Sequence, residues 1–280
     1  MTSDLPTSQQ SNSLLRVRKL SKSYVRGNLL RGRVPVEAAK DVHFEVDCAH
    51  TLAIIGASGS GKSTVARCIA GLERPDVGEV WIDGTDIAQL SFRELRPFRS
   101  VVQMIFQDAA TSMNPRFSAA EVIEEPLLIQ GQHREERRHI AETLMKKVGL
   151  SADWLDRSAA EFSGGQRQRL AIARALTLGP KLLVLDEAWC GLDLSMQAQI
   201  ANLLLDLQTE HSLSYLLISH DLALVARMAD TVAVMSHGQI VESGSTQQII
   251  SGPQHTETKK LLNSAKAAEY KPQLSKGASA

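Results

Sequence analysis

Residues 56–63 have the types and spacing of a loop that binds phosphate. They read GASGSGKS and fit the pattern G-x-x-x-x-G-K-[ST], with a further threonine at position 64. Glycines let consecutive backbone N–H groups curl around a phosphate, and a helix that begins there points its positive end at the same anion. Lys62 supplies a mobile positive charge for the β- and γ-phosphates, and the Ser63 hydroxyl can ligate Mg²⁺. The residues predicted to bind the phosphates are Gly56, Ala57, Ser58, Gly59, Ser60, Gly61, Lys62, Ser63 and Thr64.

The alternative for this segment is a Gly/Ser turn that only caps a helix. A near-continuous apolar run, TLAII at 51–55, precedes it, and helical spacing begins at Lys62. A buried strand followed directly by a glycine-rich turn and a helix is the context in which the pattern binds a nucleotide. We therefore predict a site for a nucleoside triphosphate with Mg²⁺.

Two carboxylates, Asp186 and Glu187, follow the apolar run LLVL at 182–185. Ligand sites in doubly wound sheets lie at the carboxyl ends of the strands, where the phosphate loop also lies. Asp186 can hold the metal through its water shell, and Glu187 is placed to orient an attacking water or to accept its proton. The alternative is a pair of solvated acids at a strand end, which the phosphate loop upstream disfavours.

A second helix N-terminus has no bulky side chains in its first turn. Residues 163–166 read SGGQ, in which Ser163 and Gln166 fit a capping box for the helix expected at 167–178. A cap does not explain Gly164 and Gly165, because glycine in the first turn costs helix stability. Glycines there suit a close approach to the backbone, so this helix end is predicted to be a second anion site.

The elements that must position these groups are those of an α/β fold. Near-continuous apolar runs at 51–55, 181–185 and 215–218 are typical of buried strands in a largely parallel sheet. Helical patterns alternate with these runs, as in strand–helix–strand units. A turn at His237 and Gly238 within 232–241 predicts a hairpin near the end of the chain.

The middle of the chain differs from the rest. From about 118 to 178 helix signals dominate, which predicts a helical lobe inserted into the sheet domain. Ser118 and Glu121 fit a capping box, and residues 135–148 have helical spacing. The polar N-terminus at 1–13 and the tail after 265 have the composition of disordered segments.

Composition and charge exclude several classes of protein. The 280-residue chain has 31 basic and 31 acidic residues, and this balance argues against a protein that works by wrapping nucleic acid. No apolar run approaches the roughly 18 residues of a spanning helix, and the N-terminus lacks the apolar core of a secretory signal. Cys48, Cys68 and Cys190 are odd in number and lack metal-ligand spacing, which favours a reducing cytosolic compartment.

Five segments follow one another along the chain: GASGSGKST, the glutamine after MIF (Gln107), SGGQ, LLVLDE and SHD. In this order they resemble the motifs of the ATP-binding subunit of an ABC transporter, over about residues 14–250. The resemblance implies a P-loop NTPase (RecA-like) core with a mainly parallel sheet. It also implies an N-terminal antiparallel β region and an inserted helical lobe at about 110–178. The expected division of the chain is a disordered N-terminus at 1–13, an ABC ATPase domain at 14–265 and a flexible tail at 266–280.

The resemblance implies roles for four more residues. Tyr24 matches the aromatic residue that stacks on adenine, and Gln107 matches a glutamine that reaches Mg²⁺ and couples to the membrane subunit. Asp193 matches the acid of a loop that crosses a dimer interface, and His220 matches a histidine that touches the γ-phosphate. Two alternatives stay open: Tyr24 as a strand aromatic packed in the core, and His220 as a residue beside a helix cap.

Members of this family work as a head-to-tail pair, in which each ATP lies between the phosphate loop of one subunit and the SGGQ of the other. The implied nucleotide contacts therefore include Tyr24, Gln107, Ser163, Gly164, Gly165, Gln166 and Asp193. The implied metal ligands are Ser63, Gln107 and Asp186, and the implied catalytic residues are Glu187 and His220.

One loop departs from the family pattern. Residues 187–193 read EAWCGLD where the family usually has Glu-Pro-Thr-Ser-x-Leu-Asp, so the resemblance does not predict how this loop packs at the interface. Cys190 fits either a small packed side chain or a reactive thiol. Two other segments, MIFQDAATSMNPR at 104–116 and the basic insert at 26–42, are similar to those of oligopeptide, dipeptide and nickel importers. A solvated loop is expected for the arginines of the insert.

These similarities imply an ATP hydrolase that powers the import of peptides or a related small solute, at the cytoplasmic face of the inner (plasma) membrane. The implied partners are two membrane permease subunits, a second ATPase subunit in a heterodimer and, indirectly, an extracytoplasmic solute-binding protein, with no nucleic acid. One alternative is a nickel or metal-chelate importer, suggested by Ala188 in place of proline. The other is a soluble accessory ABC ATPase, such as one in a phosphonate-degrading complex.

Overall fold

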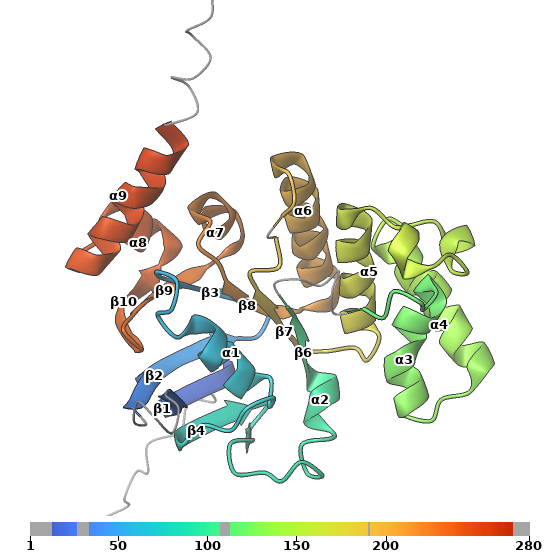
Figure 1. Cartoon of the computed structure of the whole chain (residues 1–280), viewed down its shortest axis with the longest axis horizontal. Helices are drawn as coiled ribbons and strands as arrows, with labels where there is room; N and C mark the ends of the chain where they lie inside the picture. The colour runs from blue at the N-terminus through green and yellow to red at the C-terminus, as the bar shows by residue number, and fades with distance from the viewer. Residues whose placement is uncertain (1–12, 27–33, 107–112, 190, 271–280) are drawn as a thin grey trace, which may run out of the picture.

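The computed structural model describes residues 13–26, 34–106, 113–189 and 191–270, with the backbone alone for 265–270. Its strands form a four-stranded sheet in the order β2-β1-β4-β5 and a six-stranded sheet in the order β10-β9-β3-β8-β7-β6 (Figure 1). The strands are β1 (Ser13–Arg26), β2 (Val34–Asp47), β3 (Thr51–Ile55), β4 (Val77–Ile82), β5 (Thr85–Asp86), β6 (Val102–Ile105), β7 (Leu182–Asp186), β8 (Ser214–Ile218), β9 (Thr231–Ser236) and β10 (Gln239–Ser245). The helices are α1 (Lys62–Ile69), α2 (Phe98–Val101), α3 (Ala119–Ile129), α4 (Arg134–Lys147), α5 (Gly164–Leu176), α6 (Leu194–His211), α7 (Leu222–Met228), α8 (Thr246–Ser251) and α9 (Thr256–Tyr270), with the 3₁₀ turns η1 (Ala152–Trp154) and η2 (Ala159–Glu161).

The six-stranded sheet is parallel except at one edge, where β10 returns beside β9 as the expected hairpin. β8 lies between β3 and β7, and its Leu216 is opposite both Leu52 of β3 and Val184 of β7. Every residue of these three strands is buried, which explains their apolar composition. The segments that follow β3, β7 and β8 therefore emerge side by side at one edge of the sheet.

Helix α1 lies between the two sheets (Figure 1). Its Val65 packs in one buried cluster with Leu15 of β1 and Ile54 of β3, so the antiparallel sheet holds α1 against the parallel sheet. The other face of the parallel sheet packs against α5, α6 and α7 in a second cluster, to which Leu170 and Leu204 belong. The antiparallel region and the mainly parallel core expected from the sequence are thus confirmed.

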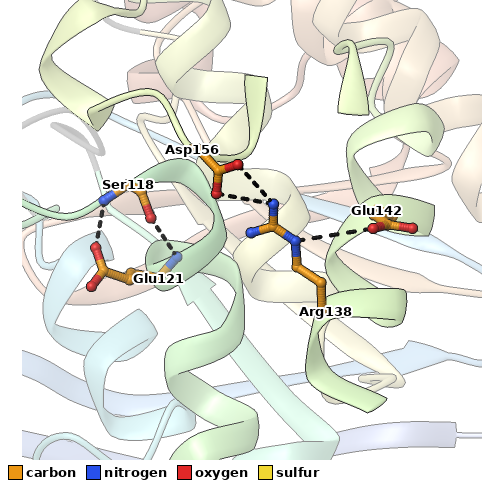
Figure 2. Close-up of polar contacts among 5 residues, drawn as sticks. All are labelled: Ser118, Glu121, Arg138, Glu142 and Asp156. Atoms are coloured by element: carbon orange, nitrogen blue, oxygen red, sulfur yellow. Dashed lines mark hydrogen bonds and ion pairs between the residues drawn. The ribbon is translucent and has the colours of Figure 1, made fainter. Parts of the chain in front are cut away.

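Helices α3, α4 and α5 lie in the chain between β6 and β7 and form a lobe beside the sheet (Figure 1). At the start of α3, Ser118 Oγ accepts the Glu121 backbone N–H at 3.2 Å, and the Glu121 carboxylate accepts the Ser118 N–H at 2.8 Å (Figure 2). This is the capping box that the sequence predicts. On α4, Arg138 Nη2 donates to both carboxylate oxygens of Asp156, at 2.9 and 3.1 Å, and Arg138 Nε lies 4.0 Å from Glu142 (Figure 2). These contacts tie α4 to the segment after η1.

Residues 34–42 of the basic insert, which contain none of its arginines, belong to a strand. β2 begins at Val34 and runs antiparallel to β1, with Val34 opposite Arg26 and Val42 opposite Leu20. The Val42 side chain is fully buried. Pairing with β1 imposes this conformation, and local composition does not reveal such pairing. The remainder of the insert, 27–33, lies outside the described residues.

The C-terminal helix α9 extends to Tyr270, so the backbone at 266–270 is helical where the sequence suggested the start of a flexible tail. The expected disordered N-terminus lies outside the described residues, except for Ser13, with which β1 begins. In the described ranges, no helix combines the length and the apolar character needed to cross a bilayer.

Candidate phosphate-binding and catalytic site

The loop between β3 and α1 follows a path that only glycine allows at one key position. Gly61 has φ 108° and precedes the first turn of α1. A Cβ at Gly61 would lie 1.9 Å from the backbone oxygen of Ala38 on β2, so the loop and the strand approach too closely for any side chain. The motif therefore requires glycine here for packing as well as for phosphate access.

The Lys62 side chain folds back over its own loop. Its Nζ donates to the backbone oxygens of Gly56 at 2.8 Å and Ala57 at 2.9 Å, and the residue is only 5% exposed. Burial lowers the pKa of Lys62, whereas the nearby Glu187 and Asp186 carboxylates act in the opposite direction. The two carbonyls thus hold a poorly hydrated ammonium group that can exchange them for phosphate oxygens.

Ser63 and Asp186 come together although they are distant in the sequence. Ser63 Oγ donates to Asp186 Oδ1 at 3.0 Å, across the gap between α1 and the end of β7. Burial raises the pKa of Asp186, the hydrogen bond from Ser63 lowers it, and the Glu187 charge raises it again. A hydroxyl and a carboxylate are the hard oxygen donors that Mg²⁺ prefers, so this pair fits the predicted metal. The third predicted ligand, Gln107, lies outside the described residues.

The two predicted catalytic residues are neighbours. Glu187 follows β7 directly, adopts φ 47°, and donates its backbone N–H to Ile218 at the end of β8 at 3.0 Å. His220 lies two residues beyond Ile218, and its Nδ1 is 3.6 Å from Glu187 Oε1. Asp221 is the actual N-cap of α7, since its carboxylate accepts backbone N–H groups at 2.9 and 3.1 Å. His220 is therefore both beside a cap and in contact with the candidate base.

One cavity of about 540 Å³ lies over part of this site, and Asp186 and His220 are not in its wall. Tyr24 of β1, Lys62 and Ser63 of α1, and Glu187 after β7 all line it. The half-buried Tyr24 ring is thus part of the cavity wall, and the alternative of a ring packed in the core is wrong. A cavity of this size, lined by a glycine-rich loop, a lysine and a carboxylate, suits a phosphorylated ligand.

Four residues of this cavity are absent from the sequence-based prediction: Val36, Glu37 and Ala38 of β2, and Arg67 of α1. Arg67 could have been found, because it lies one helical turn beyond Ser63 and thus on the same face of α1. The β2 residues carried no signal, since their place depends on how the antiparallel sheet packs against α1.

The predicted second anion site is separate from this cavity. Ser163 caps α5: its Oγ accepts the Gln166 N–H at 3.3 Å, and Gln166 Oε1 accepts the Ser163 N–H at 2.9 Å. The capping box is confirmed, but none of residues 163–166 lines the cavity over the phosphate loop. Asp193 is likewise not in that wall and instead caps α6, where it accepts the Met196 N–H at 2.9 Å. Within one chain, these residues and the phosphate loop are not brought together.

Gly165 has an intramolecular reason to be glycine. A Cβ at this position would lie 1.8 Å from the Met196 Cε atom on α6, whereas a Cβ at Gly164 would meet nothing closer than 3.8 Å. Met196 therefore occupies the space that a side chain at Gly165 would need. The expectation that the glycines allow a close approach to the backbone stays a prediction for both positions, and at the exposed Gly164 no side chain stands in the way of such an approach.

We expect Gly165→Ala to lower the free energy of unfolding by no more than about 1 kcal/mol, less than overpacking of a rigid core costs, because the added methyl group meets only the end of the flexible, half-buried Met196 side chain. Gly164→Ala is the matched control and should change stability little. In a Met196→Ala background the Gly165→Ala cost should shrink, which urea unfolding of the single and double variants would measure. Equal effects of the two alanine substitutions would contradict this packing argument.

Two residues of the unusual loop at 187–193, Ala188 and Trp189, pack inward. Ala188 and Trp189 are 3% and 4% exposed, and the Gln197 side-chain amide donates to the backbone oxygens of Trp189 at 3.4 Å and Leu192 at 3.2 Å. The side chains of Ala188 and Trp189 are thus buried in the core, and Gln197 stabilises the turn before α6 through its hydrogen bonds. Cys190, with its two alternatives, lies outside the described residues.

Most of the chain is similar to known proteins. A family model described as "ABC transporter" matches residues 39–189. The chain is 45% identical over 258 residues to the "Probable peptide ABC transporter ATP-binding protein y4tS" of Sinorhizobium fredii, a match that covers 91% of this chain and 73% of the relative. It is 42% identical over 257 residues to the dipeptide transport ATP-binding protein DppF of Haemophilus influenzae, covering 91% and 79%.

A solved structure gives the same picture. The ATP-binding cassette MJ0796, determined as a dimer in a post-hydrolysis state bound to ADP and Pi, superposes with a TM-score of 0.74 and is 28% identical to this chain. The match covers 83% of this chain and 98% of that one. The mainly parallel core, the antiparallel region and the helical segments described above are therefore shared with a known nucleotide-binding cassette.

Proposed function

The chain belongs to the ABC transporter family of ATP-binding subunits and is an ATP hydrolase, and on this premise we propose that it powers the import of peptides. The observation that carries the ATP chemistry is the meeting of Lys62, Asp186, Glu187 and His220 at one edge of the parallel sheet. The peptide cargo is supported by the relatives, which are named as peptide and dipeptide transport proteins.

In this proposal ATP binds with its phosphates on residues 56–64 and its base on the Tyr24 ring. Mg²⁺, if bound, would be held by Ser63 and by Asp186 through its water shell, with Gln107, and would neutralise phosphate charge. Glu187 orients the attacking water and accepts its proton. His220, whose imidazole lies 3.6 Å from the Glu187 carboxylate, contacts the γ-phosphate and keeps Glu187 in position.

The second subunit supplies the remaining contacts. Residues 163–166 form the N-terminus of α5, where Gly164 is exposed, and none of them lines the phosphate cavity of the same chain, which supports a site completed between two chains. Leu194, next to Asp193 at the start of α6, is 82% exposed and suits the same interface. ATP would join the two subunits, and hydrolysis would remove that link and let them separate.

The partners we propose are two membrane permease subunits, reached through the helical lobe and the Gln107 region, and a second, different ATPase subunit. An extracytoplasmic solute-binding protein would deliver the cargo to the permease. The chain would then work as a peripheral protein at the cytoplasmic face of the inner membrane. A nickel or metal-chelate cargo, and a soluble accessory role without a permease, are the outcomes against which this proposal is tested.

The experiment is an affinity purification of the tagged chain from detergent-solubilised native membranes, with mass spectrometry of the proteins that accompany it. Recovery of multi-span permeases, a second ATPase and a peptide-binding protein is expected. Recovery of a metal- or chelate-binding protein would replace the cargo, and recovery of soluble enzymes alone would overturn transport. A tagged Lys62→Ala chain, with impaired ATP binding, serves as control for ATP-dependent association.

Asp186→Asn tests the metal assignment. Because the amide loses the negative charge that orients the metal's water shell, the Mg²⁺ concentration for half-maximal ATPase activity should rise about 10- to 100-fold. Asp83→Asn is the control, since Asp83 contacts only the exposed Lys181 at 2.6 Å among the described ion pairs. An unchanged Mg²⁺ dependence of Asp186→Asn would remove Asp186 from the metal site.

A further inference from the structure

We propose that Glu73 is a positioning residue for ATP, which holds the Tyr24 ring in place as a wall of the nucleotide cavity. The inference rests on the proposed function, in which Tyr24 stacks on the base. Glu73 itself does not line the cavity. Its effect on ATP is therefore indirect, and it should change the KM for ATP rather than the chemistry.

The helix that binds the phosphates also places Glu73. α1 begins at Lys62 and ends at Ile69, and Gly71 turns the chain with φ 64°. The backbone N–H of Glu73 then donates to the Arg67 oxygen at 3.2 Å, which closes the helix end. A single rigid element therefore carries Lys62 at one end and the Glu73 carboxylate at the other.

Both carboxylate oxygens of Glu73 are engaged. Oε2 accepts the hydrogen bond of the Tyr24 hydroxyl, and Oε1 lies 3.2 Å from Arg67 Nε. The Tyr24 hydroxyl is also 3.5 Å from Thr64 Oγ1, another α1 residue. Burial raises the pKa of Tyr24 and the Glu73 carboxylate raises it further, so the hydroxyl keeps the proton that it donates. The ring is thus bonded to the helix that begins at the phosphate loop.

The strand end that carries Tyr24 needs such support. Next to it, Val25 is 65% exposed, so core packing does little to restrain this end of β1. A second acid, Asp76, accepts the Ser23 backbone N–H at 2.7 Å and pairs with Lys22 at 2.8 Å. Asp76 therefore fixes the backbone beside Tyr24, and Glu73 fixes the ring. A ring held in its bound orientation loses less conformational entropy when a ligand stacks on it.

The arrangement also predicts what Tyr24 does not do. Because its hydroxyl is bonded to Glu73, the ring offers a flat π-face to a base and not a hydrogen bond. Stacking of this kind depends little on which base is bound. Loss of the Glu73 contact should therefore weaken ATP and GTP to a similar degree.

The test is steady-state ATPase kinetics of the full chain, purified with its partner subunits, for a double-mutant cycle. Tyr24→Phe and Glu73→Ala should each raise the KM for ATP about three- to tenfold, with kcat within twofold; this is less than the full contribution of a hydrogen bond to a charged group, because the bond acts on ATP only indirectly. The double variant should be no worse than either single one. Glu73→Gln should restore KM, because its amide oxygen still accepts the Tyr24 hydroxyl, and Glu79→Ala is the exposed control.

The outcomes separate this inference from the proposed function. If Tyr24→Ala raises KM but Tyr24→Phe and Glu73→Ala do not, the base site stands and the role of Glu73 is overturned. Should Tyr24→Ala leave KM unchanged, the proposed stacking on Tyr24 fails together with the inference. A fall in kcat in Glu73→Ala that Glu73→Gln does not rescue would indicate a general structural effect and would also overturn it. Tyr24→Phe keeps the test valid if Glu73→Ala does not fold.

Discussion

Replacing Glu187 with glutamine is expected to lower the ATPase kcat by about a hundredfold to ten-thousandfold, the usual contribution of a general base, while ATP still binds. Glutamine preserves the shape of the side chain and can still contact His220, which lies 3.6 Å away in the wild-type protein. It cannot accept the proton of the attacking water. Single-turnover hydrolysis and equilibrium binding of ATP, measured on the same preparation, separate the two effects.

The stalled variant should also change the oligomeric state. If ATP joins two subunits through the phosphate loop and residues 163–166, a protein that binds ATP without hydrolysing it should accumulate as a dimer in the presence of ATP. Size-exclusion chromatography with light scattering would detect this dimer, and Glu210→Gln, an exposed acid on α6, is the control. Hydrolysis by Glu187→Gln at the wild-type rate would remove Glu187 from the base role.

Lys62→Ala should strongly weaken the binding of ATP. The Lys62 ammonium is the buried cation of the cavity wall, and two charge-assisted contacts to phosphate oxygens account for about a hundredfold to a thousandfold in affinity. The variant should also unfold at a somewhat lower temperature, since the Gly56 and Ala57 oxygens lose their donor at 2.8 and 2.9 Å. Calorimetric titration with ATP, together with thermal unfolding, measures both effects.

The matched control is Lys181→Ala. Lys181 is exposed and pairs with Asp83 at 2.6 Å, outside the cavity. Its loss removes the same charge from the chain and should leave ATP affinity within twofold. If both lysine variants weakened ATP alike, net charge rather than the Lys62 contacts would explain the effect.

Most of the phosphate-binding half could be predicted from the sequence. The strand at 51–55 and the start of α1 at Lys62 are observed as expected, and Ser118 and Ser163 form the capping boxes that their spacing indicates. Burial of consecutive apolar residues, a helix cap and a glycine-rich turn are each decided within a few residues of the chain. In such short segments the residue types and their order determine the local hydrogen bonds and burial, so the sequence is sufficient to predict the local structure.

Other features depended on segments that meet only after folding. β2 is a strand because it pairs with β1, and Gly165 meets the end of the Met196 side chain from α6. The unusual loop after Glu187 is accommodated because Trp189 has room in the core. No spacing in the sequence predicts these contacts, because each contact depends on how separate elements pack in three dimensions.

The sequence by itself thus determined which chemistry this protein performs, because phosphate binding needs a contiguous loop whose backbone and lysine are local. The tertiary structure alone decided how the part of the cavity wall at Tyr24 is built. Tyr24 and Glu73 are 49 residues apart, and they meet only because the antiparallel sheet packs against α1. Packing of that kind is set by the whole apolar surface of both elements and not by any one motif.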